Sequence, residues 1–174
     1  MTEMIGNAKY EFRRHKGLAD RVISQLDDAD FFRRPSDDVN PVALIVKHLS
    51  ANLLSRWTDF LTTDGNKPGR DRDSEFRLAP EDTRASLLTA WERGWQSLFN
   101  TLDSLTDSDL DKTVTIGGEA HSVAQAVLRS LTHVAYHTGQ IMYLTRYLRP
   151  ESVWATIAPG QSRNHPAAYL KAKS

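Results

Sequence analysis

The sequence predicts an all-α protein, a four-helix bundle with a long crossover between the second and third helices and a short hairpin before the fourth. Four stretches repeat their apolar residues at the helical period of about 3.6 residues. A polar segment between the second and third stretches is long enough to be a crossover. The chain has 174 residues, 40% of them hydrophobic, which suits one domain with its own core.

The first two helices are predicted from apolar faces. The first is expected to end near Asp27, and its apolar face consists of Ile5, Ala8, Phe12, Ala19, Val22, Ile23 and Leu26. The second is expected to begin with Asn40 as N-cap and Pro41 at the first helical position. It runs to Leu61 and ends at Asp64-Gly65, a typical turn pair.

The crossover and the third helix follow. Residues 66–78 contain proline, glycine and alternating Arg and Asp, and they are the predicted crossover loop. The third helix is expected to start around Pro80. Its apolar face consists of Leu87, Leu88, Trp91, Trp95, Leu98, Leu102 and Leu105. The two tryptophans lie four residues apart, which places them together in the core.

A hairpin is predicted before the last helix. The β-branched run Thr113–Ile116 meets Gly117-Gly118, which favours a tight turn, and Glu119–His121 can then form the second strand. Ser122 and Gln125 make a capping box, so the fourth helix is expected to begin there.

The end of the bundle is marked by proline. The fourth helix is predicted to continue to about Leu148, because Pro150 cannot extend it. We therefore assign the bundle to residues 1–150. Residues 151–174 include Pro159-Gly160 and are expected to form an extended C-terminal tail.

Composition restricts the classes of function. The chain has 22 Lys and Arg against 22 Asp and Glu, so the basic excess of nucleic-acid-binding domains is missing. It has no cysteine, which excludes disulfides, a Cys nucleophile and thiolate metal sites, and favours the cytoplasm. The longest apolar run is Val42–Val46, and no signal-peptide pattern opens the chain. We expect a cytoplasmic protein with neither nucleic acid nor membrane as partner.

The fourth helix carries the first candidate site. His133 and His137 lie four residues apart, so their side chains leave the same face with Cβ atoms about 5–6 Å apart and can bind one metal ion. Both border the buried stripe of the helix. Two hydrogen-bonded core histidines are an equally good interpretation. No Glu follows the first histidine, so the zincin motif with its built-in base is excluded.

The second helix carries a narrow polar strip of His48, Asn52, Ser55 and Asp59. Apolar residues flank this strip on both sides, so it can face an internal cavity, although a strip facing water is the alternative. With His48 near the histidine pair, three imidazoles would form a site with an open position, which catalytic zinc uses.

Three other histidines are weaker candidates. His15 lies on the apolar face of the first helix and could compete as the third ligand. His121 lies in the hairpin and His165 in the tail, and neither has a partner at ligand spacing.

The residues around the candidate ligands resemble the DinB/YfiT-like superfamily. The matching segments are Ile45–Phe60, which contains His48, and Leu131–Ile141, which contains His133 and His137 in an H-x-x-x-H-x-G-Q-I pattern. The resemblance extends over nearly the whole chain. It implies a four-helix bundle, often a homodimer, that binds a divalent metal such as zinc or nickel through these three histidines. Characterised relatives include transferases and isomerases that use a low-molecular-weight thiol, and proposed hydrolases.

We therefore predict a divalent-metal-dependent enzyme acting on a small-molecule substrate. The resemblance favours S-transfer with a low-molecular-weight thiol as cosubstrate. A metal-dependent hydrolase is one alternative, and a non-catalytic dimeric bundle that binds metal or a small molecule is another. A fourth protein ligand from Asp59, Glu119 or His15 would favour the last, because structural zinc usually has four.

Two further residues are predicted to belong to the cofactor-binding site. Gln140 lies one turn beyond His137 and can orient its ring or form a pocket wall, although a solvent-facing Gln is equally compatible with the pattern. Asn52 lies one turn beyond His48 in the polar strip. The sequence assigns no catalytic side chain.

Overall fold

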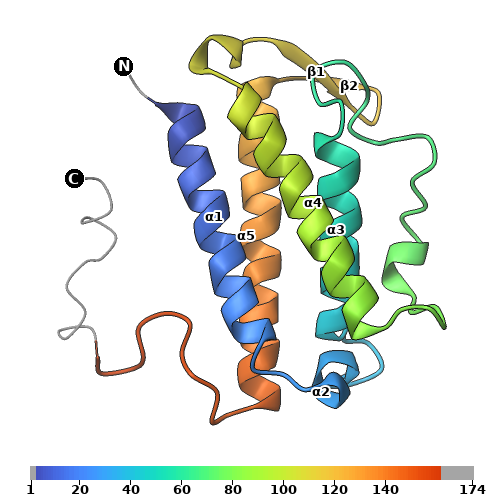
Figure 1. Ribbon diagram of the computed structural model, residues 1–174, viewed down its shortest axis with the longest axis vertical. Coiled ribbons are helices and arrows are strands. Elements are labelled where there is room, and N and C mark those ends of the chain that lie inside the picture. The colour runs from blue at the N-terminus through green and yellow to red at the C-terminus, as the bar shows by residue number, and fades with distance from the viewer. Residues whose placement is uncertain (1–2, 162–174) are drawn as a thin grey trace.

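The computed structural model describes residues 3–161 and shows a mostly helical protein with one small sheet (Figure 1). This agrees with the predicted all-α class. In chain order the elements are α1 (Met4–Ile23), α2 (Asp28–Phe32), α3 (Val42–Trp57), the 3-10 helix η1 (Ser74–Phe76), α4 (Arg84–Ser104), the 3-10 helix η2 (Asp107–Asp109), β1 (Thr113–Ile116), β2 (Glu119–Ser122) and α5 (Val123–Leu148).

The direction of the long helices explains the crossover. In Figure 1 the chain descends through α1, rises through α3 and again through α4, and descends through α5. Because α3 and α4 run the same way, the chain between them must return along the length of α3, about 24 Å for its 16 residues. The connection, residues 58–83, does this on the outside of α3, where η1 contacts it.

The first helix ends earlier than predicted. α1 stops at Ile23, and a short helix, α2, follows that the sequence pattern did not predict. Asp27 does not extend α1 but caps α2, because its side chain accepts a hydrogen bond from the backbone N–H of Asp30 at 2.8 Å. Leu26 is nevertheless buried, so the apolar pattern continued into a turn that packs against the core.

Both predicted ends of the second long helix were wrong. Pro41, not Asn40, is the N-cap of α3, and the backbone N–H groups of Leu44 and Ile45 bond to the Pro41 carbonyl. The helix ends at Trp57 instead of continuing to Leu61. Phe60 lies in the turn after the helix, in which Asp59 has a positive φ. It is still buried, because its ring stacks on that of Trp57 with 4.8 Å between the ring centroids.

The boundaries of the fourth predicted helix were predicted more accurately than the start of the third. α4 begins at Arg84 rather than near Pro80, because Thr83 and Ser86 form the capping box. The predicted start of the last helix is confirmed, since the Ser122 and Gln125 side chains each bond to the other's backbone N–H. Its end at Leu148 is confirmed as well.

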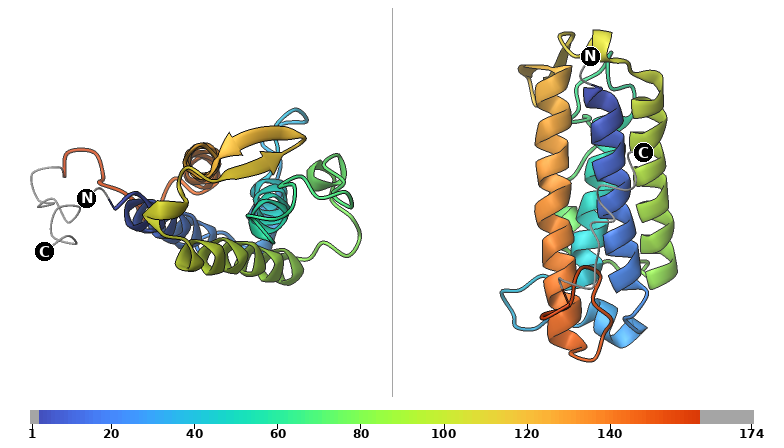
Figure 2. Two further views of the ribbon diagram at one scale, coloured as in Figure 1. Left: turned by 90° about the horizontal axis from the view of Figure 1, so that it is seen from above. Right: turned by 90° about the vertical axis from the view of Figure 1, so that its left-hand side faces the viewer.

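The predicted hairpin is confirmed as an antiparallel pair, β1 and β2, with Ile116 opposite Glu119. Gly117 and Gly118 both have positive φ, which suits the turn between the strands. The hairpin extends from the start of α5 toward the end of α3 (Figure 2). There the Asp64 carboxylate accepts hydrogen bonds from both glycine N–H groups at 2.7 Å. The start of the connection is thereby fixed to the sheet.

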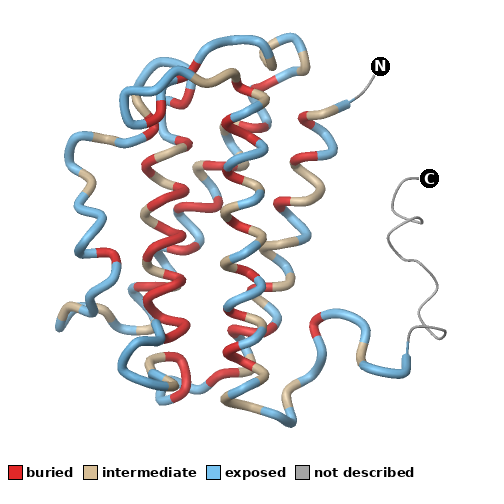
Figure 3. The backbone as a smooth tube through the Cα atoms, turned by 180° about the vertical axis from the view of Figure 1, so that it is seen from behind, coloured by how far each residue is buried: buried red, intermediate tan, exposed pale blue. Residues whose placement is uncertain are grey.

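The core joins all the long helices. Phe12 of α1 meets Trp57 of α3 and Trp95 of α4 edge to face, at 6.0 and 6.5 Å. Gly94 lets α4 approach α3 closely, since a Cβ there would lie 2.8 Å from the Ser50 carbonyl oxygen. α3 is buried along most of its length (Figure 3). Most of the polar side chains on α3, namely those of His48, Ser50, Asn52 and Ser55, therefore lie inside the protein.

The region after α5 is only partly described. Residues 151–161 form turns and bends without helix or strand. Residues 162–174 of the predicted tail, including His165, lie outside the described residues. No helix in the described range is both long and apolar enough to cross a membrane.

Candidate metal centre

The three predicted histidines meet between α3 and α5. His48, His133 and His137 each place a ring nitrogen within 4.8 Å of the others. Their ring centroids lie 4.7–5.1 Å apart. The cluster arises because His48 lies on the inward face of the buried helix α3, while the i and i+4 residues of α5 face it. Of the predicted polar strip, His48, Asn52 and Ser55 are therefore buried inside the protein, whereas Asp59 is exposed.

His48 is oriented by a buried carboxylate. Its Nδ1 lies 2.8 Å from Glu75 Oε2 and donates to it, which leaves the Nε2 lone pair free. Arg70 binds the same carboxylate through two N–H groups at 2.6 and 2.9 Å. Burial alone would raise the pKa of Glu75, but the bonds from His48 and Arg70 outweigh it and lower the pKa below its usual value. Glu75 is therefore a carboxylate that fixes the His48 ring.

His137 is oriented by Gln140, as the predicted role of this glutamine requires. His137 Nδ1 lies 2.7 Å from Gln140 Oε1, an acceptor, so Nδ1 carries the proton and Nε2 is available. Gln140 itself is exposed at the edge of the site.

The third ring, His133, faces the first. His133 Nε2 and His48 Nε2 are 3.1 Å apart, close to the spacing of about 3.3 Å expected for two nitrogens bound tetrahedrally to one zinc at 2.0–2.1 Å. The Nδ1 of His133 is buried and has no hydrogen-bond partner among the described residues. The donor set therefore fits a divalent cation that prefers imidazole ligands.

Burial keeps two of the rings uncharged. Desolvation, with help from neighbouring positive charges, lowers the pKa of His133 to about 3. Desolvation also lowers the pKa of His137 to about 4, although the bond to Gln140 acts in the opposite direction. Neutral imidazole is the form that binds metal, so both rings are ready as ligands at neutral pH.

The connection after α3 contributes residues that the sequence reasoning missed. Besides Glu75 and Arg70, it supplies Phe76, whose ring stacks on His48 at 4.7 Å. These residues lie in a polar segment without periodicity, and the only sequence signal for Glu75 is that it is an acid in the crossover loop. Its partner, His48, lies 27 positions earlier on another element.

The other candidates lie outside the cluster. Among the described residues no fourth His, Asp or Glu joins the three histidines, so Asp59, Glu119 and His15 lie outside the cluster. Asp59 is exposed beyond the end of α3. Ser55 is buried, but its hydroxyl donates to the Gly65 carbonyl at 2.9 Å and thus fixes the connection. A site with three protein ligands leaves positions open.

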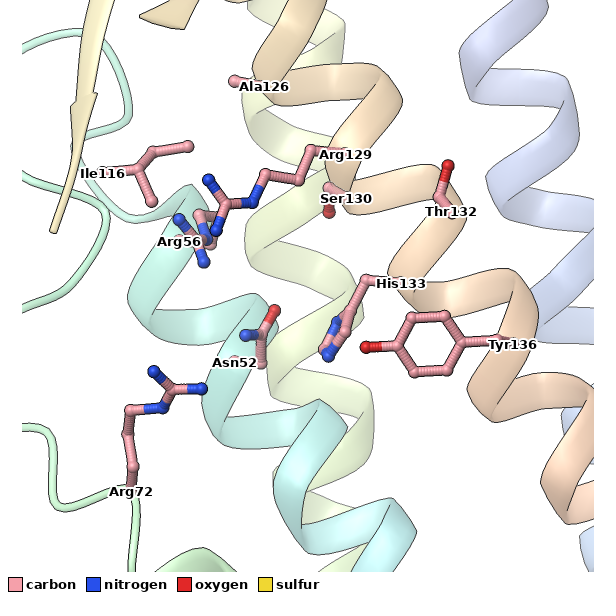
Figure 4. A pocket seen from close by; sticks show the side chains of 10 residues that line it. All are labelled: Asn52, Arg56, Arg72, Ile116, Ala126, Arg129, Ser130, Thr132, His133 and Tyr136. Atoms are coloured by element: carbon pink, nitrogen blue, oxygen red, sulfur yellow. The ribbon is translucent and has the colours of Figure 1, made fainter. Parts of the chain in front are cut away.

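A cavity of about 430 Å³ opens beside His133 (Figure 4). We call it the arginine pocket. It is lined by Asn52, Arg56, Arg72, Ile116, Ala126, Arg129, Ser130, Thr132, His133 and Tyr136. Asn52, which was predicted to belong to the cofactor-binding site, is buried and lines this pocket. In Figure 4 the Tyr136 hydroxyl points toward His133, and burial raises the pKa of this phenol, so it stays protonated.

Residues 1–161 match the model of a family described as protein of unknown function, DUF1572. The chain belongs to the DUF1572 family. No curated protein matches the sequence. The DUF1572 match includes His48, His133 and His137, so the whole cluster lies within the region that the family model covers.

Proposed function

We propose that the protein is a divalent-metal-dependent enzyme whose cation is bound by His48, His133 and His137. The observation that carries this proposal is the three-histidine cluster, in which two rings have their outer nitrogens occupied by Glu75 and Gln140. Such outer partners are typical of metal-binding histidines, because they fix the tautomer and the ring orientation. Zinc and nickel are the cations we favour, since both accept imidazole ligands.

The residues around the cluster have distinct roles in this proposal. A divalent cation with open positions supplies a Lewis acid that lowers the pKa of a bound water or thiol. Glu75 and Gln140 hold two rings in place, and the arginine pocket admits a small-molecule substrate at His133. Tyr136 can donate a hydrogen bond to that substrate, and Asn52 can position it.

We further propose thiol-dependent S-transfer as the reaction. The chain contains no cysteine, so the thiol must be a separate low-molecular-weight cosubstrate. The only carboxylate hydrogen-bonded to the cluster in the described residues is Glu75, which already binds His48 and Arg70. Without a free carboxylate base, metal-dependent hydrolysis is the second candidate, because a water would need such a base more than an acidic thiol does.

Membership of the DinB/YfiT-like superfamily, with its four-helix bundle, is part of the proposal. It is supported by the order of the long helices and by the long connection after α3. We also propose a cytoplasmic homodimer. Its candidate interface is the exposed pair Tyr143 and Tyr147 on α5, where Tyr143 is 73% exposed.

Cobalt substitution tests the reaction class. If the protein is a thiol-dependent transferase, adding 2-mercaptoethanol to the cobalt-loaded protein will produce sulfur-to-metal charge-transfer absorption, and no protein cysteine can mimic it. The His133→Ala variant serves as the matched control without the band. A hydrolase would instead turn over ester or amide probes and be inhibited by thiol. A spectrum indifferent to several millimolar thiol, with no turnover, would favour a non-catalytic bundle.

A further inference from the structure

We propose that the arginine pocket is an oxyanion-binding subsite, which holds a carboxylate or phosphate group of the molecule that reaches the metal centre. This inference rests on the proposed function for the identity of the neighbouring centre, but its own geometry is independent of the metal. Three guanidinium groups, those of Arg56, Arg72 and Arg129, line one cavity. They come from α3, the connection and α5, so the fold brings them together.

In the described part of the chain, these arginines have no carboxylate as an ion-pair partner. Among residues 3–161, none of the three forms an ion pair with Asp or Glu, and the remaining residues of the sequence contain neither acid. Arg70 differs from these three arginines. It lies two residues from Arg72, but it binds the Glu75 carboxylate through two N–H groups. The described residues thus pair the arginine beside the pocket with a carboxylate, whereas the three arginines in the pocket have no such pair. The charge of Asp64 acts on Arg56, but the Asp64 carboxylate accepts hydrogen bonds from the backbone of Gly117 and Gly118.

Arg56 is the most costly of the three to keep charged. Its Nη1 is buried without a hydrogen-bond partner in the described part of the chain. Burial, followed by the charge of Arg129, lowers the pKa of Arg56 to about 10. A partly buried cation beside other cations is unfavourable unless an anion joins it. Guanidinium groups bind carboxylate and phosphate through paired hydrogen bonds, which makes an oxyanion the matching ligand.

The local backbone makes room for Arg56. A Cβ on Gly65 would lie only 2.9 Å from Arg56 Cδ, so a larger residue would displace the arginine stem. Gly65 is itself fixed, since its N–H donates to the Thr115 carbonyl and its carbonyl accepts from Ser55. The hairpin and α3 therefore fix the backbone of Gly65 beside the Arg56 stem, which keeps the space for this side chain open.

The pocket has the other features of a small-molecule subsite. Its volume of about 430 Å³ lies within the range of roughly 300–1,000 Å³ that ligand pockets occupy. Ser130 lines the wall with a hydroxyl that accepts from the Trp57 indole at 3.2 Å and keeps its own proton to donate. His133 belongs both to this wall and to the histidine cluster. An oxyanion held by the arginines would place the rest of its molecule next to the metal centre.

Calorimetric titration of metal-free protein with inorganic phosphate and with acetate tests the subsite. We expect both anions to bind and uncharged acetamide not to bind. Arg56→Met and Arg129→Gln should each weaken anion binding by about 10-fold or more, because each variant loses at least one charge-assisted hydrogen bond to the anion. Arg93→Gln, an exposed arginine of α4, is the matched control and should leave binding unchanged. Equal anion affinity in wild type, Arg56→Met and Arg129→Gln would overturn the proposal.

Thermal unfolding separates an anion site from a structural role. If Arg56 serves an anion, Arg56→Met should raise the unfolding midpoint of the ligand-free protein and abolish its increase on adding phosphate. A lower midpoint with unchanged anion binding would show a structural arginine and contradict the proposal. Because Arg129 is exposed, Arg129→Gln is expected to fold normally, and its anion affinity decides the question if Arg56→Met does not fold.

Two further comparisons distinguish this proposal from the metal site and identify the source of the anion. His137 does not line the arginine pocket, so the His137→Ala variant should lose metal binding yet retain phosphate binding. If wild type binds phosphate but no metal, only the proposed function is refuted. If wild type binds metal but no phosphate, only the subsite is refuted.

The source of the anion is tested with two thiols in the cobalt-loaded protein. If 3-mercaptopropionate binds more tightly than 3-mercapto-1-propanol, the thiol carries the anion. If the two thiols bind equally and the metal-free protein still binds anions, the other substrate carries it.

Discussion

The helices and the connection contribute to the candidate metal centre in different ways. α3 and α5 supply the three imidazoles, at positions fixed by helical geometry and by core packing. The connection, residues 58–83, supplies the groups that surround them, among them Glu75 on His48 and Arg72 in the arginine pocket. The helices thus hold the candidate ligands, while the irregular connection orients one of them and gives the pocket part of its charge.

The largest expected effect follows from removing a ligand on the helices. His48→Ala, His133→Ala and His137→Ala should each lower metal affinity by more than about 100-fold, beyond the upper range for outer partners. His121→Ala is the control, because His121 lies in the hairpin, bonded to Glu119 and Arg129. Competitive titration against a coloured chelator measures the change. Unchanged affinity in any one of the three variants would remove that histidine from the ligand set.

Removing the orienting carboxylate on the connection should have the next largest effect. Glu75→Gln keeps an acceptor for His48 but loses the charge, and metal affinity should fall about 10-fold, whereas Glu75→Ala should cost up to about 100-fold. Glu75→Ala also leaves Arg70 buried and unpaired, so unfolding free energy should fall by about 3 kcal/mol. If both variants bind metal like wild type, the connection contributes only to stability.

The polar partner on the helix should matter less. Gln140→Leu removes the acceptor of His137 Nδ1, and we expect metal affinity to fall by about 10-fold at most. Since Gln140 is exposed, the unfolding midpoint of the metal-free protein should hardly change. Comparing Gln140→Leu with Gln140→Glu, which restores an acceptor, separates orientation from packing. Tight metal binding in both would leave Gln140 as a surface residue.

A separate effect, on stability and not on metal affinity, concerns pH. His133 and His137 have folded-state pKa values of about 3 and 4, below the unfolded value of about 6.5. The unfolded chain therefore binds more protons between pH 6.5 and 4, so the stability of the metal-free protein should fall as pH drops through this window. Urea unfolding of wild type and His133→Gln at several pH values checks this. The variant should show a shallower pH dependence, and identical slopes would contradict the burial of this ring.

Periodic elements could be predicted from the sequence, and irregular ones could not. The long helices, the Ser122 capping box and the spacing of His133 and His137 each leave a local pattern. The end of α3 left no local pattern. Phe60 continues the apolar periodicity of the helix, although it lies in the following turn and packs on Trp57 from there. Glu75 and the unpaired state of Arg56 left none either, since both depend on residues brought close only by the fold.

The metal content of the protein shows whether His48, His133 and His137 bind a divalent cation. Protein purified without a histidine tag, reconstituted with zinc, nickel or cobalt and then dialysed, can be assayed by elemental analysis beside the His48→Ala, His133→Ala and His137→Ala variants. We expect about one divalent ion per chain in wild type and less than a tenth of that in each variant. A wild-type protein that retains no more metal than its variants would contradict a metal centre between α3 and α5.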